Sequence, residues 1–367
     1  MTERVKKEPL MHISKRADLV WWKGWIIRAV AIVAALLVCA LVIVWLTGYN
    51  PIKVYAEMIR GNFGTKRKIW ILLQRLAMLL CISLAVTPAF KMKFWNLGAQ
   101  GQVLMGALAA TACMFYSKSS LPSWALILVM FLAAVISGMI WAFIPAIFKA
   151  NWNTNETLFT LMMNYIAIQS VKYAVAVWVP NGSGKLPILN PSTHAGWLPD
   201  LFGQEYVVNI LIVALVTILM AIYLKYTKQG YEISVVGGSE NTARYVGISV
   251  KRVILRTLLI SGALCGLAGF LLVSGTNHSL TESIEEGMGF TAIMVSWLAK
   301  FSPITMVFTS FLIVFLQRGA SAIATTFQLN ESVADILTGI ILFFIIGCEF
   351  FIRYKVNFRK KSKEGDK

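Results

Sequence analysis

The sequence predicts an all-α, polytopic membrane protein. Of its 367 residues, 57% are hydrophobic and only 14% are charged, whereas an average soluble domain carries about 25% charged residues. Several apolar runs reach roughly 20 residues, the length that a helix needs to cross a hydrocarbon core about 30 Å thick. Because lipid satisfies no backbone hydrogen-bonding group, runs of this length are expected to be helices.

Long apolar runs follow one another along the whole chain, and two shorter segments accompany them. The shorter ones, Val103–Tyr116 and Met288–Ala299, are expected to cross or re-enter the membrane, because the charges of the loops fit together only when both are counted. The total is then about ten crossings. The long runs are Ile26–Leu46, Ile69–Phe90, Leu121–Phe148, Leu158–Val179, Val207–Leu224, Val253–Val273, Ile304–Ile323 and Ala334–Ile352.

Basic residues gather in the two tails, residues 1–25 and 353–367, and the chain has a net charge of +17. No soluble domain presents these charges to a nucleic acid, so contact with anionic membrane lipid explains them more simply. We expect both tails in the cytoplasm and residues 26–352 to form the transmembrane domain. Loop 180–204, poor in Lys and Arg, is expected outside. Loop 48–70 is basic yet falls outside in the same topology, which leaves its side of the membrane open.

The two short segments would be the third and the eighth of ten. They would occupy corresponding places in two halves of five, and an odd number of crossings per half inverts one half relative to the other. Paired short segments of this kind point to a transport site near the middle of the membrane. An inverted five-plus-five repeat is therefore possible, although the residues of the two halves show no convincing similarity.

The stretch WNLGAQGQ, from Trp95 to Gln102, interrupts the apolar sequence just before the first short segment. Its two glycines allow a bend and close approach of the backbone, and its three amide side chains offer donors and acceptors without a charge. It could line the path of a neutral, hydrogen-bonding solute. On spacing alone, the stretch fits better a helix–loop boundary in which the amides bond to the backbone and the glycines allow tight packing. Asn164, in the middle of an apolar run, could face the pathway or hydrogen-bond a neighbouring helix.

The basic loop 226–252 contains SENTARY, from Ser239 to Tyr245. Ser239 is a suitable N-cap, Glu240 favours the first turn of a helix, and Gly247 can end it. We therefore expect a short cytoplasmic helix, which on these residues alone could belong to an ordinary amphipathic loop.

Several chemistries are poorly supported by the residues. The five cysteines and three histidines show no metal-ligand spacing, no catalytic motif is present, and no GxxxxGK[ST] loop occurs that would hold a nucleotide. Acidic pairs are missing from the middle of the apolar runs. This counts against an ion-gradient-driven secondary transporter, which remains the alternative function, and a membrane-embedded enzyme fits least.

Motifs between about residues 50 and 350 resemble permease subunits of bacterial ATP-binding cassette (ABC) importers, nearest to the nucleoside and simple-sugar group that is related to ribose and branched-chain amino-acid permeases. The family pattern FNIGAEGQ-x-x-MGALAA is similar to the stretch that begins at Phe94. The pattern G-x-x-x-R-A-V-G-x-N-x-x-A-A-R-Y-x-G-I is similar to the stretch that begins at Gly230. Three further stretches match: NETLFTLMMNYIA from Asn155, SGALCGLAGF from Ser261 and GMGFTAIMVSWLAKFSP from Gly287.

The chain departs from the family patterns at several positions. Gln100 stands where the family usually has Glu, so a role that needs a carboxylate there is in doubt, and with it the identity of the solute. The other departures are Ser234 for Arg, Thr242 for Ala, and the unusual Trp297 and Lys300.

The resemblance implies a transport subunit that forms half of a pathway for a nucleoside or simple sugar, without a cofactor of its own. ATP would be hydrolysed by a partner ATPase subunit that binds a coupling helix of the permease. The coupling residues would be Glu240, Asn241, Thr242, Ala243, Arg244, Tyr245 and Gly247. The other implied partners are a second permease subunit, identical or related, and an extracytoplasmic solute-binding lipoprotein, all at a bacterial cell membrane. The candidate pathway residues are Asn96, Gln100, Gln102, Asn164, Phe290 and Trp297.

Overall fold

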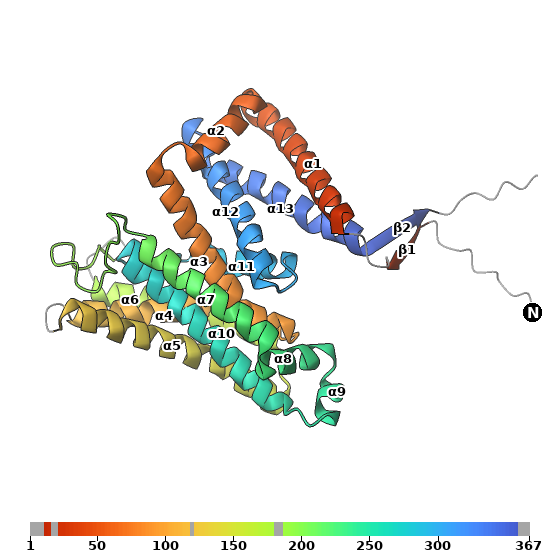
Figure 1. Ribbon diagram of the computed structural model, residues 1–367. Helices are drawn as coiled ribbons and strands as arrows, with labels where there is room; N and C mark the ends of the chain where they lie inside the picture. The colour runs from red at the N-terminus through yellow and green to blue at the C-terminus, as the bar shows by residue number, and fades with distance from the viewer. Residues whose placement is uncertain (1–10, 16–20, 118–120, 180–185, 359–367) are drawn as a thin grey trace, which may run out of the picture. The chain divides into compact units, whose positions relative to one another are not determined.

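The computed structural model describes residues 11–15, 21–117, 121–179 and 186–358 (Figure 1). These residues form α-helices, one π-helical turn and a two-stranded sheet. The elements are β1 (Met11–Lys15), α1 (Trp21–Thr47), α2 (Pro51–Phe63), α3 (Lys66–Lys91), α4 (Ala99–Ser117), α5 (Ser123–Trp152), α6 (Glu156–Trp178), α7 (Val207–Tyr226), α8 (Lys228–Gly238), α9 (Glu240–Tyr245), α10 (Val250–Leu272), η1 (Val273–Asn277), α11 (Met288–Leu298), α12 (Pro303–Thr326), α13 (Glu331–Arg353) and β2 (Tyr354–Phe358).

Seven helices in the described residues are long and apolar enough to cross a membrane, which confirms the polytopic prediction. They are α1, α3, α5, α7, α10 with η1, α12 and α13. The predicted segments at α4 and α6 are helices of 19 and 23 residues, and α11 is a short apolar helix of 11 residues. α4 begins at Ala99, four residues before the apolar run. The backbone N–H of Gln102 already donates a helical hydrogen bond to the carbonyl of Gly98, with the two atoms 3.0 Å apart.

The chain divides into two compact units, one built from its two ends and one from residues 65–315. In the first unit α1 packs against α13, and the guanidinium of Arg28 pairs with the carboxylate of Glu349 at 2.5 Å. Next to these helices β1 and β2 pair antiparallel, with Met11 opposite Phe358 and Lys15 opposite Tyr354. The pairing brings both tails to the same end of this unit and adds strands that the all-α prediction lacked.

α10 is the centre of the second unit, where it packs against α3, α4 and α5 (Figure 1). Small residues recur along α10, and they allow the backbones to touch. A Cβ atom at Gly266 would lie 2.2 Å from the carbonyl oxygen of Ala134 in α5, and one at Gly262 would lie 2.3 Å from that of Gly138. The glycine-rich stretch therefore fixes a close three-helix contact rather than a flexible segment.

The loop that follows α6 packs against η1, the turn at the C-terminal end of α10. The indole of Trp197 lies between two imidazoles, 4.4 Å from the ring of His194 and 3.7 Å from that of His278, nearly parallel to both. The hydroxyl of Ser274 donates to the carbonyl of Gly196. Burial, followed by the neighbouring His194, lowers the pKa of His278 from 6.5 to about 4. The imidazole of His278 is therefore neutral near pH 7.

Candidate functional site

The predicted polar interruption lies at a sharp break between α3 and α4, which we call the polar break (residues 92–102). Lys93 adopts the left-handed conformation with φ of 63°. The amide of Phe94 donates to the carbonyl of Ala89, and that of Lys93 to Phe90. These two bonds close the helix end in the way that usually needs a glycine. The chain then turns, and α4 starts at Ala99.

Asn96 organises the turn with all of its amide atoms. It is fully buried. Its Oδ1 accepts from the backbone N–H of Gly98 at 3.0 Å and from Nε2 of Gln102 at 3.2 Å. Its Nδ2 donates to the hydroxyl of Ser261 in α10 at 3.2 Å. Gln102, only 1% exposed, therefore supports Asn96 instead of presenting its amide to a cavity within this chain.

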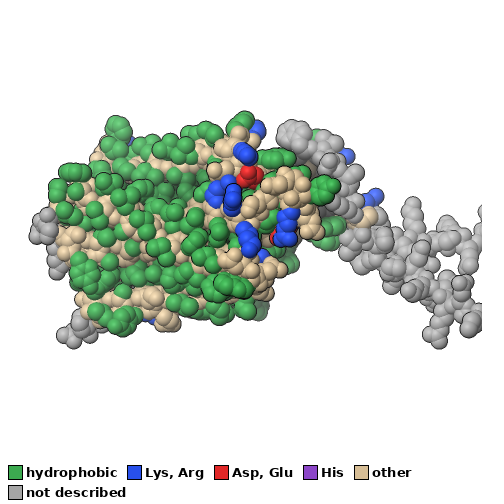
Figure 2. Space-filling model, turned by 90° about the horizontal axis from the view of Figure 1, so that it is seen from below, with side chains coloured by type: hydrophobic (Ala, Val, Ile, Leu, Met, Phe, Trp, Pro, Cys, Tyr) green, Lys and Arg blue, Asp and Glu red, His purple; other side chains and the backbone are tan. Residues whose placement is uncertain are grey.

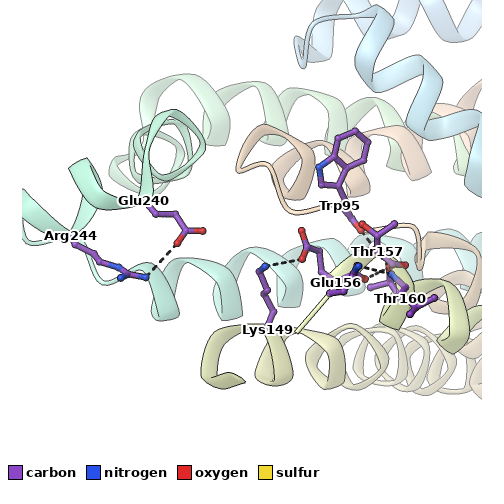
Figure 3. A network of polar contacts seen from close by, with 9 residues as sticks. Trp95, Lys149, Glu156, Thr157, Thr160, Glu240 and Arg244 are labelled. Atoms are coloured by element: carbon purple, nitrogen blue, oxygen red, sulfur yellow. Dashed lines mark hydrogen bonds and ion pairs between the residues drawn. The ribbon is translucent and has the colours of Figure 1, made fainter. Parts of the chain in front are cut away.

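Asn164 in α6 hydrogen-bonds to the same turn with both atoms of its side-chain amide. Its Oδ1 accepts from the N–H of Gly101, and its Nδ2 donates to the carbonyl of Leu97, both at 2.8 Å. One turn earlier in α6, Oγ1 of Thr160 accepts from the N–H of Leu97 at 3.1 Å, and its hydroxyl lies 3.5 Å from the carbonyl oxygen of Trp95 (Figure 3). Because buried backbone groups must find partners, these side chains hold the break in place.

Gln100 points in another direction, toward the start of α11. A Cβ atom at Gly289 would lie 3.0 Å from the backbone nitrogen of Gln100, so the two helices touch. Glu285, 1% exposed, accepts from the N–H of Gly289 at 2.8 Å. Burial raises the pKa of Glu285, while the N–H groups of Gly289 and Gly287 and the amide of Gln100 oppose the rise. The side-chain amide of Gln100 thus hydrogen-bonds to the carboxylate of Glu285. A glutamate at position 100, as in the family pattern, would place a second carboxylate there and be repelled.

The two remaining candidate pathway residues, Phe290 and Trp297, lie on the exposed side of α11, with 43% and 37% of their surface accessible. The indole of Trp297 stacks on that of Trp95, with ring centroids 5.5 Å apart and planes at 29°. Phe90 meets both indoles edge to face. The sequence stretch around Trp95 and the helix around Trp297 are therefore brought together, 200 residues apart in the chain.

The predicted coupling residues form α9, as expected. The hydroxyl of Ser239 accepts from the N–H of Thr242 at 3.3 Å and caps the helix. Glu240 and Arg244 pair across one turn at 3.4 Å (Figure 3). Gly247, with φ of 80°, donates to Arg244, and Ile248 donates to the carbonyl of Ala243. The start and stop signals in the sequence are both confirmed.

α9 is anchored by one residue and exposes the others. Ala243 is fully buried in a cluster with Ile233 of α8, Ile254 of α10 and Phe94 of the polar break. Asn241, Thr242 and the remaining coupling residues are exposed, and Tyr245 reaches 95% exposure. Figure 2 shows a face on which Lys and Arg side chains gather at one end, while hydrophobic side chains cover much of the rest.

α8 joins α9 to the end of α3 by direct backbone contact. A Cβ atom at Gly237 would lie only 2.1 Å from the carbonyl oxygen of Lys91, one residue before the polar break begins. The carboxylate of Glu232 also receives the guanidinium of Arg256 from α10 at 2.9 Å. A displacement of α9 would thus reach the break through a short, closely packed connection.

Sequence reasoning missed four residues that complete these contacts: Trp95, Thr160, Ser261 and Glu285. Signals existed for three of them. Ser261 begins a recognised motif, Thr160 lies one turn before Asn164, and Trp95 adjoins the polar amides. Glu285 gave none, because its loop looked merely acidic.

The sequence matches the family described as the branched-chain amino acid transport system permease component over residues 69–346. Curated relatives include the glucose ABC transporter permease of Haloferax volcanii, 28% identical over 94% of this chain and 93% of its own length. The nucleoside ABC transporter permease of Lactococcus lactis is 27% identical over 87% of this chain and 90% of its own. The guanosine ABC transporter permease NupP of Bacillus subtilis is 26% identical over 92% and 97%. Because the family match spans well over half of the chain, the protein belongs to this family and is a permease subunit of an ABC importer.

Proposed function

We propose that the chain forms half of the translocation pathway for a nucleoside or a simple sugar, and that a separate ATPase subunit drives it from α9. The solute class is supported by the names of the relatives, which transport glucose, nucleosides and guanosine. The sequence has no nucleotide-binding loop of its own, so the energy must come from a partner.

The observation that carries the proposal is the build of α9. Six residues form a capped helix in which Ala243 is buried against the second unit and the other side chains are exposed. A hollow of about 590 Å³ opens beside it, lined among others by Lys149, Glu240 and Arg244. The exposed Tyr245 lies close to this hollow, which carries both positive and negative side chains. Such a surface suits a protein partner, because Tyr and Arg are enriched among the residues that contribute most to binding at protein interfaces.

Motion of α9 would be transmitted through α8 to the polar break. We propose that Asn96, Gln102 and Asn164 act in the pathway as the frame of the break, since their amides are already engaged with backbone and with one another. Phe290 and Trp297, the exposed side chains of α11, face outward from that frame and would contact the solute. Gln100 would act in the pathway by holding Glu285 at the start of α11. Rigid elements that rock about a fixed site are the usual means of alternating access.

The proposed topology has ten crossings in two halves of five, with α4 third and α11 eighth. It is supported by the pairing of β1 with β2, since tails that pair lie on one side of the membrane. Their basic residues favour the cytoplasm of a bacterial cell. A second permease subunit, identical or related, would complete the pathway, and an extracytoplasmic solute-binding lipoprotein would deliver the solute.

The test is replacement of Tyr245 by Asp in the transporter expressed with its partner subunits. A buried carboxylate at the proposed interface should abolish ATPase co-purification and ATP-dependent uptake, while the amount of permease in the membrane stays unchanged. Phe202→Asp is the matched control, because Phe202 is a 91% exposed aromatic in the loop before α7. Retention of the ATPase and of uptake by Tyr245→Asp would contradict the proposal.

A further inference from the structure

Two tryptophans expose their indoles where the ends of α3 and α11 meet. Trp95 is 46% and Trp297 37% exposed, although they stack on each other. Two phenylalanines orient the pair: Phe90, itself only 3% exposed, is edge-on to both, and Phe301 is edge-on to Trp297 with centroids 5.5 Å apart. In Figure 3 the indole of Trp95 points away from the polar network that fixes its backbone. The pair is thus held from one side and open on another.

Both helix ends beside the indoles are strained. Lys93, after α3, has φ of 63°, and after α11 Lys300 and Phe301 have φ of 52° and 60°. None of these is a glycine, and such left-handed residues persist only where the surroundings impose them, often at ligand sites. Left-handed residues therefore lie beside the aromatic pair on two segments distant in sequence.

The exposed surface at these ends is mixed in character, since Lys93 and Lys300 are exposed two and three residues from the indoles. A planar, apolar ring with a polar edge matches this surface. A nucleobase has such a ring, and every base stacks on an aromatic side chain, whereas a sugar ring meets an indole only through its C–H groups.

We propose that Trp95 and Trp297 form a stacking platform for the base of a nucleoside, at the end of the half-pathway nearest α8. The inference rests on the proposed function and narrows its solute class from nucleoside or simple sugar to nucleoside. It also gives Trp297, which departs from the family pattern, a specificity-determining role that it shares with Trp95.

The experiment uses the whole transporter, with its ATPase, second permease and solute-binding lipoprotein, in cells for uptake and in lipid nanodiscs for labelling. Uptake of adenosine is compared with uptake of ribose, which lacks the base, in the wild type and in Trp95→Leu, Trp297→Leu and Trp95→Phe. In parallel, 8-azidoadenosine is photo-linked to the complex and the modified peptide is identified by mass spectrometry. Trp124→Leu is the control, since Trp124 is 72% exposed at the start of α5.

We expect ATP-dependent uptake of adenosine but not of ribose. The KM for adenosine should rise about tenfold in each leucine variant, as expected for the loss of one stacking partner, with kcat nearly unchanged. Trp95→Phe and Trp124→Leu should keep the wild-type KM to within about twofold. The photo-label should map to the peptides that contain Trp95 or Trp297, and excess adenosine should prevent it where ribose does not.

Uptake of ribose but not adenosine would overturn the platform and leave the permease function standing. So would an unchanged KM in both leucine variants, or a label carried only by lipid or by the second permease. If a leucine variant does not assemble, the photo-label on the wild type still tests the platform, because the labelled peptide either contains Trp95 or Trp297 or does not. A wild type without ATP-dependent uptake of adenosine, ribose, guanosine or glucose would overturn the proposed function itself.

Discussion

Gly237 of α8 lies between α9, the proposed coupling helix, and the polar break, and alanine at this position tests that junction. The added methyl group would lie 2.1 Å from the carbonyl oxygen of Lys91, whereas ordinary contact begins at 3.4 Å. α8 must then move from the end of α3 by roughly 1 Å, and overpacking of this kind costs about 1–3 kcal/mol. If that strain bears on only one of two transport states, their ratio changes by about 5- to 150-fold.

We expect Gly237→Ala to keep its ATPase partner, because the exposed surface of α9 is unchanged, and to transport at least fivefold less solute per ATP hydrolysed. The assay measures uptake and ATP hydrolysis on the same reconstituted transporter. Gly238→Ala is the matched control, since no atom lies within 4 Å of a Cβ atom added there. Equal coupling ratios in Gly237→Ala and Gly238→Ala would refute the transmission of motion through α8.

Three further substitutions test the buried contacts. Asn164→Ala leaves two buried backbone groups without partners and should lower the free energy of unfolding by about 2–5 kcal/mol, seen as a lower thermal midpoint in detergent. Gly266→Ala should prevent close packing of α10 on α5 and reduce folded yield, while Gly339→Ala, with open space around it, should not. The folded-state pKa of His278 lies below its ordinary value. The stability that the neutral imidazole contributes is therefore present above pH 6.5 and is lost as pH falls toward 4. The loss in the free energy of unfolding is about 1–2 kcal/mol after allowance for partial exposure. His278→Gln should remove this part of the pH dependence, and equal acid sensitivity of both proteins would show that the stack on Trp197 has no such role.

The helices were predictable because apolar length leaves a membrane chain few choices. The bounds of α9 were predictable in detail, since Ser239 and Gly247 are local signals whose effect depends on neighbours within one or two turns. The start of α4 was misplaced because Gln100 and Gln102 are polar. Burial among the partners supplied by Asn96 and Glu285 lets these residues occupy a helix, and hydropathy cannot register such partners.

The function of the polar stretch could not be decided from sequence, since either alternative requires the same residue types. Contacts between distant segments separate the roles: Asn96 meets Ser261 of α10, and Trp95 meets Trp297 of α11. The pairing of β1 with β2 was equally out of reach, because strand partners hundreds of residues apart leave no local pattern in two basic tails.

Contact between Tyr245 and the ATPase subunit is the most direct test of how this permease is driven. With benzoylphenylalanine in place of Tyr245, irradiation of membranes that contain the whole transporter should link the permease to the ATPase, and the same replacement at Phe202 should not. An absent ATPase adduct at position 245, or equal adducts at both positions, would contradict an account in which α9 receives the force that moves the polar break.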